Sequence, residues 1–339
     1  MIYVVLFFLG FSLLLYVLFA GADFGAGIVE LFSSRENQEI TKKTIYRVMG
    51  PVWEANHIWI IIMIVILWVA FPIYYNVIVI SLHIPLTLML LGITFRGVAF
   101  VFRHYDAFID KSQHVYDWMF RMASIVTPIF LGITFGAVVS GEITMATHLE
   151  ALSFKAVYID SWFNSFSILT GCFFAALCAF LSTVLLIGES TKDTRKIYSR
   201  KAAIATVVVV ILGFVTFLFG YLNDIAFVVN FLNNPYGIAC IVLSAVLLFP
   251  MWKAIKQKRR IFSRLYAGLQ VLFIVIAPLA AHYPTVLYTN EGAISILDQA
   301  APDSVIQVLG ISLLIGGFVI LPGLFHLLKS FKMIKILEK

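Results

Sequence analysis

The sequence predicts an all-α polytopic membrane protein with about nine transmembrane helices. Of its 339 residues, 61% are hydrophobic and only 12% are charged, which gives a mean hydropathy of +0.98. Soluble domains do not have this composition, so the classes of soluble enzyme and soluble binding module are excluded. The net charge of +6 comes from bases in the short loops between apolar segments, so it does not indicate a nucleic-acid partner.

The transmembrane helices are expected wherever about 20 mainly apolar residues follow one another, because that length crosses about 30 Å of hydrocarbon. No linker or soluble domain interrupts these segments, so residues 1–339 are expected to form a single transmembrane domain. The longest outer connection, residues 282–303, has room for a short interfacial helix but for no separate fold. The expected spans are residues 3–31, 53–71, 76–102, 118–140, 161–187, 202–221, 236–252, 263–281 and 304–328.

The lysine and arginine residues predict the orientation of the chain, because cytoplasmic loops of membrane proteins carry an excess of both. Of the 24 such residues, only Arg96 and Lys155 lie away from one side of the predicted array. We therefore expect the N-terminus outside and the C-terminus in the cytoplasm. The bases on the predicted cytoplasmic side are Arg35, Lys42, Lys43, Arg47, Arg103, Lys111, Arg121, Lys192, Arg195, Lys196, Arg200, Lys201, Lys253, Lys256, Lys258, Arg259, Arg260, Arg264, Lys329, Lys332, Lys335 and Lys339.

The second predicted span begins in an unusual polar segment, Gly-Pro-Val-Trp-Glu-Ala-Asn-His-Ile-Trp at residues 50–59. A proline suits the first turn of a helix, where its missing N–H costs nothing. Glu54, Asn56 and His57 follow it. Such side chains are costly at membrane depth unless they are paired or functional, so this segment is the first candidate for a functional site.

Three ionisable residues on consecutive spans are expected at one depth. Asp23 lies about 30 Å along the first span, near the inner boundary, at about 1.5 Å per residue. Glu54 begins the second span at that boundary, and Arg96 lies toward the inner end of the third. We expect Arg96 to pair with Glu54 or with Asp23, since pairing lowers the cost of burying either charge. With Asn56 and His57, these groups form a candidate site for proton uptake from the cytoplasm.

A simpler interpretation is that these charges are interfacial. Acids near helix ends can cap the helix or reach water, and an arginine can extend to the lipid headgroups. This interpretation explains any one of the three residues taken alone. Their common depth on three adjacent spans favours a functional polar site for the group.

Cofactor ligands are not evident in the sequence. No two histidines have a spacing that would hold a haem between two helices at mid-depth, so no axial ligand is named. His83 precedes Pro85 and is interpreted as the neighbour of a helix kink. The three cysteines form no metal-binding pattern and are interpreted as small buried hydrophobic residues, so no metal site is predicted.

Two runs in the first third of the chain carry a family resemblance. They are Gly-Ala-Asp-Phe-Gly-Ala-Gly at residues 21–27 and Pro-Val-Trp-Glu-Ala-Asn-His-Ile-Trp at residues 51–59. Together with Ala-Phe-Pro-Ile-Tyr at 70–74 and Phe-Arg-Gly at 95–97, they closely resemble subunit II of the cytochrome bd quinol oxidases. The second half of the chain resembles that family only in its pattern of spans.

The resemblance implies two four-helix bundles with one peripheral helix, in the bacterial cytoplasmic membrane. It implies a homologously folded subunit I that carries haems b and d, and a very small single-helix subunit. The complex would oxidise quinol and reduce O₂ to water without pumping, and a structural quinone is known in subunit II of the family. No haem would be ligated by this chain.

The resemblance also implies roles for individual residues. The acid at the position of Glu54 belongs to a proton path at the subunit interface, and Asp23 and Arg96 belong to the same polar region. This sequence departs from many relatives at Ala55, where glycine is usual, and at His57, where Gln or Glu is common. Neither change removes the acid, but His57 adds a group that can titrate.

Two other functions are compatible with the residues. One is a secondary transporter with a substrate or ion site formed by Asp23, Glu54 and Arg96, although such sites usually lie near the midplane of repeated halves. The other is an assembly scaffold, in which the polar cluster only fixes the register of the helices. A transporter would purify alone and without colour. For an assembly scaffold, replacement of Glu54 by Gln would lower the yield of the complex but not its turnover per haem.

Overall fold

The computed structural model describes residues 1–50, 53–105, 112–144, 153–190 and 192–330. These residues form mainly helices, which confirms the prediction of an all-α polytopic membrane protein. Among them, eight helices are long and apolar enough to cross a membrane, and nine if one sharply bent pair of helices counts as a span. The helices are α1 (Ile2–Leu31), α2 (Arg35–Met49), the 3₁₀ turn η1 (Ala55–His57), α3 (Ile58–Ala70), α4 (Pro72–Ser81), α5 (His83–Tyr105), α6 (Ser112–Ser140), α7 (Phe154–Tyr158), α8 (Ser165–Glu189), α9 (Lys192–Leu222), α10 (Ala226–Leu232), α11 (Pro235–Lys256), α12 (Arg260–His282) and α13 (Asp303–Ser330).

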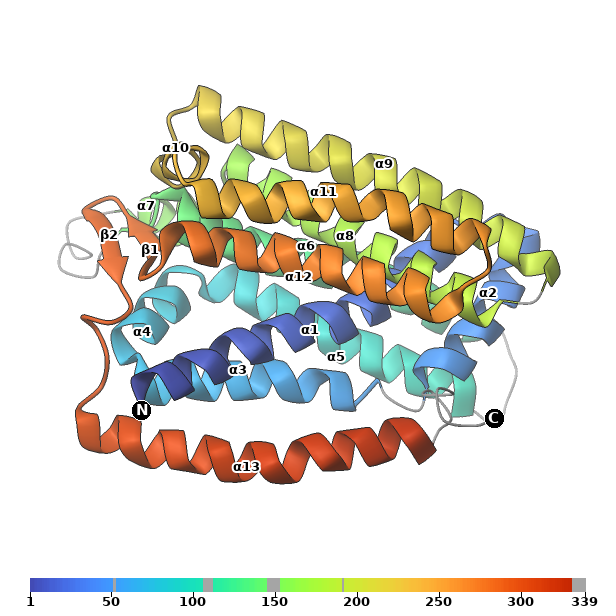
Figure 1. The fold of residues 1–339 in the computed structure, drawn as a ribbon, viewed down its shortest axis with the longest axis horizontal. Coiled ribbons are helices and arrows are strands. Elements are labelled where there is room, and N and C mark those ends of the chain that lie inside the picture. Colours follow the sequence, from blue (N-terminus) through green and yellow to red (C-terminus); the bar gives the residue numbers. More distant parts are fainter. Residues whose placement is uncertain (51–52, 106–111, 145–152, 191, 331–339) are drawn as a thin grey trace.

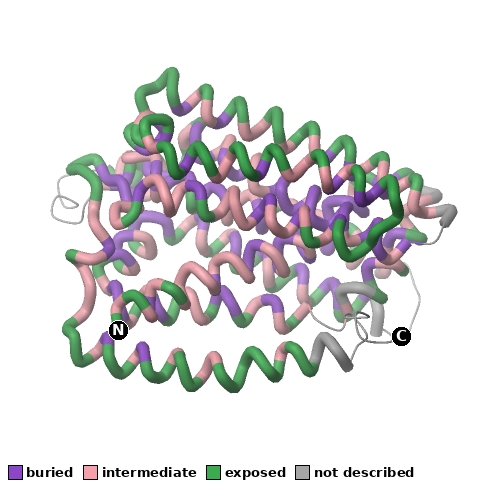
Figure 2. The backbone as a smooth tube through the Cα atoms, viewed as in Figure 1, coloured by how far each residue is buried: buried purple, intermediate pink, exposed green. Residues whose placement is uncertain are grey.

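The long helices run side by side in two groups (Figure 1). The first group contains α1, α3, α5 and α6, and the second contains α8, α9, α11 and α12. Helix α8 packs against α1 and α6 and so joins the two groups. Helix α13 lies at the edge of the molecule. Only 6% of the apolar 18-residue stretch of α13 is buried, compared with 67% of the corresponding stretch of α8. Figure 2 shows the same contrast between the buried centre and the exposed outer helices.

The two ends of the bundle differ. One end, here called the α2 end, carries α2 and the turn between α11 and α12 (Figure 1). The other, here called the hairpin end, carries α4, α7, α10 and two short strands. Successive long helices run between these ends in alternating directions. The described loops that hold most of the bases lie at the α2 end, which is the arrangement that the distribution of Lys and Arg predicts.

The third span begins later than the sequence predicts. The prediction covers residues 76–102, but residues 76–81 belong to α4, which is bent by 117° from the segment Ala55–Ala70. The bend lies at Phe71, whose φ of −135° and ψ of 61° leave the helical region. The cause is Pro72, because a proline disfavours the helical conformation of the residue before it. A second break, at Leu82, separates α4 from the crossing helix α5, which starts at His83.

The connection between α12 and α13 is also different from the prediction. Instead of a short interfacial helix, it holds an antiparallel hairpin of β1 (Thr285–Thr289) and β2 (Gly292–Ser295). Residues 285–289, Thr-Val-Leu-Tyr-Thr, are β-branched or aromatic at most positions, and Gly292 adopts a φ of +128°. Both features favour a hairpin over a helix. The hydroxyl of Tyr74 in α4 donates a hydrogen bond to the carbonyl of Ile294, which fixes the hairpin to the bundle.

Candidate functional site

A buried ion pair joins α1 to α5. Arg96 Nη1 donates to Asp23 Oδ2 at 2.6 Å, and Arg96 Nη2 donates to Asp23 Oδ1 at 2.8 Å. Arg96 also donates to the Asp23 carbonyl at 2.9 Å and, through Nε, to Ser124 Oγ of α6 at 3.0 Å. The two residues are 1% and 0% exposed. Of the two partners that the sequence allowed for Arg96, the structure therefore selects Asp23.

Small residues bring the three helices close enough for this pair to form. A Cβ atom on Gly27 of α1 would lie 2.1 Å from Ser124 Oγ, and one on Gly92 of α5 would lie 2.3 Å from Thr127 Oγ1. Both helices therefore pack backbone-close against α6, as small residues allow within membranes. The ring of Phe120, also on α6, lies 4.8 Å from Arg96 Cζ and shields the guanidinium from lipid.

A second buried ion pair lies two helical turns away, and it was not predicted from the sequence. Arg103 Nη2 lies 2.9 Å and 3.0 Å from the two carboxylate oxygens of Glu30. Arg103 Nε also lies 3.1 Å from Asp117 Oδ1, which Lys42 of α2 approaches at 2.8 Å. Glu30 and Arg103 are 2% and 5% exposed.

The seven-residue spacing within each helix was the available signal for this second pair. Glu30 follows Asp23 by seven positions on α1, and Arg103 follows Arg96 by seven on α5. Seven residues make about two helical turns, so both acids face the same side of α1 and both arginines the same side of α5. The prediction places Arg103 at the flank of a cytoplasmic loop because it lies at the end of its span.

Glu54 does not enter this buried cluster. It immediately precedes η1, and its side chain is exposed. Its carboxylate makes no hydrogen bond to any other residue that the structure describes. Exposed residues recur at positions 54, 58 and 61, whereas Asn56 and Trp59 are buried, so Glu54 lies on the outward face of this segment. The expectation that Glu54 would join Asp23 and Arg96 inside the protein is therefore not met within this chain.

His57 and Asn56 lie on the inward side of the same turn. Asn56 is 6% exposed. The His57 ring is half-buried, and its centre lies 5.9 Å from the Phe24 ring and 6.1 Å from the Tyr16 ring, both on α1. Since Phe24 follows Asp23 directly, η1 lies level with the buried ion pair, as the depth arithmetic predicted.

Trp53 connects Glu54 to α5. A Cβ atom on Gly97 would lie 3.3 Å from the Trp53 ring, so glycine lets the indole rest on the helix there without a shift. The Trp53 and Phe100 rings are 5.2 Å apart. The residue before Glu54 is thus held by the helix that carries Arg96 and Arg103, so the position of Glu54 depends on that of α5.

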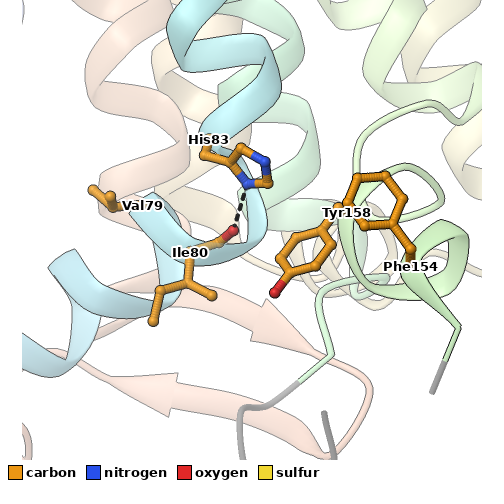
Figure 3. Close-up of a pocket in the computed structure, with 5 residues that line it drawn as sticks. All are labelled: Val79, Ile80, His83, Phe154 and Tyr158. Carbon is orange, nitrogen blue, oxygen red and sulfur yellow. Dashed lines mark hydrogen bonds between the residues drawn. The ribbon is translucent and has the colours of Figure 1, made fainter. Parts of the chain in front are cut away.

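A separate cavity of about 420 Å³ opens at the hairpin end (Figure 3). Val79, Ile80, His83, Phe154 and Tyr158 line it. His83 Nδ1 hydrogen-bonds the Ile80 carbonyl at 2.9 Å, and its ring lies 4.9 Å from that of Tyr158. His83 begins α5 just after the break at Leu82, which fits its interpretation as a kink neighbour. The cavity lies at the opposite end of α5 from Arg96 and does not belong to the site.

Comparison with known proteins supplies the family context of this site. Residues 1–331 match the family model described as cytochrome bd terminal oxidase subunit II. The chain is 27% identical to cytochrome bd ubiquinol oxidase subunit 2 of Bacillus subtilis, over 67% of this chain and 66% of the relative. It is 22% identical to the putative cytochrome bd menaquinol oxidase subunit II of the same organism, over 94% of this chain and 91% of the relative.

Two further similarities differ in extent. The match to cytochrome bd-I ubiquinol oxidase subunit 2 of Escherichia coli K12 is 27% identical and covers 36% of this chain and 31% of the relative. The first Bacillus match and this one thus span less than two thirds of the relatives' lengths. The structure of bd oxidase from Geobacillus thermodenitrificans has a chain with the same fold, at a TM-score of 0.75 and 18% identity, covering 96% of this chain and 97% of that one.

Proposed function

Because this chain belongs to the cytochrome bd terminal oxidase subunit II family, we propose that it is a subunit of a bacterial respiratory complex that oxidises quinol and reduces O₂. Its partner is a homologously folded subunit I that carries haems b and d, and a very small single-helix subunit accompanies them. The complex lies in the cytoplasmic membrane, with the α2 end of this chain toward the cytoplasm. The transporter hypothesis is not retained.

Within that complex, this subunit supplies part of the path by which protons reach the oxygen-reduction site from the cytoplasm. The observation that carries the proposal is an exposed carboxylate, Glu54, in a segment that lies level with a buried and fully paired one, Asp23. A proton carrier must bind and release a proton repeatedly. Asp23 would have to break two hydrogen bonds to Arg96 to do so, whereas Glu54 has no such bond within the described chain.

The two ion pairs have a positioning role in this proposal. They fix α5 against α1, and α5 in turn holds Trp53 next to Glu54. A bidentate contact between an arginine and a carboxylate restricts orientation as well as distance. The proposal therefore gives Asp23, Glu30, Arg96 and Arg103 the role of fixing the helices, as in the scaffold hypothesis. It assigns proton transfer to Glu54.

Replacement of Glu54 by Gln tests the proposal in the assembled complex. Glutamine keeps the shape of the side chain but cannot carry a proton, so oxygen reduction per haem should fall while the haem content stays constant. Glu142→Gln is a matched control, because Glu142 is exposed at the hairpin end. A normal turnover in Glu54→Gln rejects the relay, and a lower yield with normal turnover would assign Glu54 to assembly.

A further inference from the structure

His57 is placed between the exposed Glu54 and the interior of the bundle. The two residues are three positions apart in one helical turn, where the backbone N–H of His57 donates to the Glu54 carbonyl at 3.2 Å. Side chains three positions apart lie on neighbouring parts of a helix surface. The Glu54 and His57 side chains therefore lie on neighbouring parts of this segment, and the Nδ1 edge of the His57 ring is buried in the protein.

The inward edge of His57 faces polar atoms that have no partner. His57 Nδ1 and the Tyr16 hydroxyl are both buried, and neither has a hydrogen-bond partner among the described residues. Their rings are 6.1 Å apart, and Tyr16 is 2% exposed. A buried polar atom without a partner costs free energy, so a water bound between these two groups would satisfy both.

The polar line continues along α1 away from the α2 end. Ser12 lies one turn beyond Tyr16 on the same face of α1, and it is 0% exposed. Its hydroxyl, too, lacks a partner in the part of the chain that the structure describes. Glu54, His57, Tyr16 and Ser12 thus form a sequence of polar groups that leads from the surface toward the middle of the bundle.

The charges around His57 are also defined. From α1 it faces Asp23 and Tyr16, and from α5 it faces Arg96; its own segment contributes Glu54. Arg96 and Asp23 neutralise each other in their ion pair. His57 is therefore surrounded by apolar rings and a compensated pair, and Glu54 is the charged group on its own segment.

We propose that His57 is the second proton carrier of the path and passes protons from Glu54 to Tyr16 through a water bound between Nδ1 and the Tyr16 hydroxyl. This inference rests on the proposed function. In the transfer, neutral His57 accepts a proton on Nε2 from protonated Glu54 and releases the proton of Nδ1 to the bound water. The water passes a proton to the Tyr16 hydroxyl as that hydroxyl gives up its own proton toward Ser12. Glu54 is left as a carboxylate and takes its next proton from the cytoplasm. The ring returns to its first tautomer before the next transfer.

The alternative is that His57 is only a packing residue between Tyr16 and Phe24. The two roles differ in what a substitution changes. Packing acts on the amount and stability of the complex, whereas proton transfer acts on turnover, its pH dependence and its solvent isotope effect. His83, which begins α5 at the hairpin end, provides a matched control because it is exposed and lies far from Glu54.

The experiment uses the complete complex carrying His57→Gln, Tyr16→Phe, Glu54→Gln or His83→Gln. For each variant, turnover per haem is measured from pH 5.5 to pH 9 in H₂O and in D₂O. We expect His57→Gln to slow turnover at least about tenfold, to raise the solvent isotope effect and to remove a histidine titration from the pH profile. Tyr16→Phe should change the turnover and the isotope effect in the same direction but by less, and His83→Gln should change neither.

The outcomes separate this inference from the proposed function. If Glu54→Gln is slow and His57→Gln has the wild-type rate and pH profile, the relay through His57 is wrong and the role of Glu54 stands. If Glu54→Gln runs at the wild-type rate, the proposed function fails and the transfer from Glu54 to His57 fails with it. Should His57→Gln not assemble, Tyr16→Phe tests the same step, since it removes only a hydroxyl; normal kinetics there overturn the inference.

Discussion

The two groups of helices are held together by different chemistry. In the first group, α1 and α5 are joined by two buried ion pairs, Asp23–Arg96 and Glu30–Arg103. In the second group, the ion pair described between α8 and α12 joins Glu189 to Arg264, and their side chains remain 34% and 29% exposed. The helices of the second group pack otherwise through an apolar core, which also includes residues of α1, α5 and α6.

This difference indicates what the buried charges are for. The second group shows that apolar side chains suffice to pack these helices, and replacing a buried ion pair with apolar residues is often neutral or stabilising. The first group therefore has no need of its ion pairs for cohesion alone. What they add is a single position of α5 along α1, and with it the position of Trp53 and Glu54.

The largest expected effect comes from leaving a buried charge without its partner. Arg96→Leu removes the guanidinium and isolates Asp23, which should destabilise the protein by about 3–5 kcal/mol. The double variant Asp23→Leu with Arg96→Leu should recover much of that loss, because no charge is then left unpaired. The thermal midpoint and the amount of assembled complex measure both variants. Equal stability of the single and double variants would contradict the role given to the pair.

The second ion pair should respond less, because Arg103 keeps another partner. Glu30→Gln removes the charged acceptor at 2.9 Å but leaves Asp117 at 3.1 Å from Arg103 Nε. We expect a loss of about 1.5–3 kcal/mol, the range for a hydrogen bond to a charged group. Thermal unfolding of the purified complex measures it. A loss as large as that of Arg96→Leu would mean that Asp117 does not compensate.

The close approach of α1 to α6 is tested by adding a side chain at Gly27. Gly27→Leu places atoms where Ser124 already lies, since the added Cβ would be 2.1 Å from its hydroxyl oxygen, and overpacking of this kind costs about 1–3 kcal/mol. Gly10→Leu is a control in the same helix, since nothing lies within 4 Å of a Cβ there. The thermal midpoint should fall for Gly27→Leu alone. If both variants behave alike, close packing at Gly27 does not hold the ion pair.

Hydropathy and spacing predicted much of this arrangement. Long apolar runs locate the helices because a membrane leaves the backbone few alternatives. The common depth of Arg96 and Asp23 follows from the rise per residue and the direction of each span, although the same reasoning also allowed Glu54 as the partner of Arg96. Spacing along a helix fixes depth, but the rotation of the segment after Pro51 decides which side chains point inward. The outward face of Glu54 was for that reason not predictable from depth alone.

The remaining errors have local causes. Arg103 lies at the end of an apolar span, where an interfacial arginine and a buried arginine have the same sequence context. The one sign that Arg103 is buried is that it follows Arg96 by seven residues, as Glu30 follows Asp23. The predicted second span ends at the bend at Phe71, but the break at Leu82 was hidden because α4 is as apolar as a crossing helix. The orphaned atoms of His57 and Tyr16 depend on the contact between η1 and α1, which no single segment of sequence contains.

The smallest effect is expected in the second group, and it tests the contrast most directly. Arg264→Gln removes the contact of 2.7 Å to Glu189 and a hydrogen bond of 3.1 Å to the Leu185 carbonyl, but the side chains of Arg264 and Glu189 are both about one third exposed. Such a pair contributes less than about 1 kcal/mol, and salt screens it further. We expect a small change of the thermal midpoint at low salt and a smaller one at high salt, measured beside Arg96→Leu, whose effect should not depend on salt. If Arg264→Gln destabilises the complex as strongly as Arg96→Leu, then charge pairing holds both groups of helices in the same way. In that case the buried ion pairs between α1 and α5 have no separate positioning role.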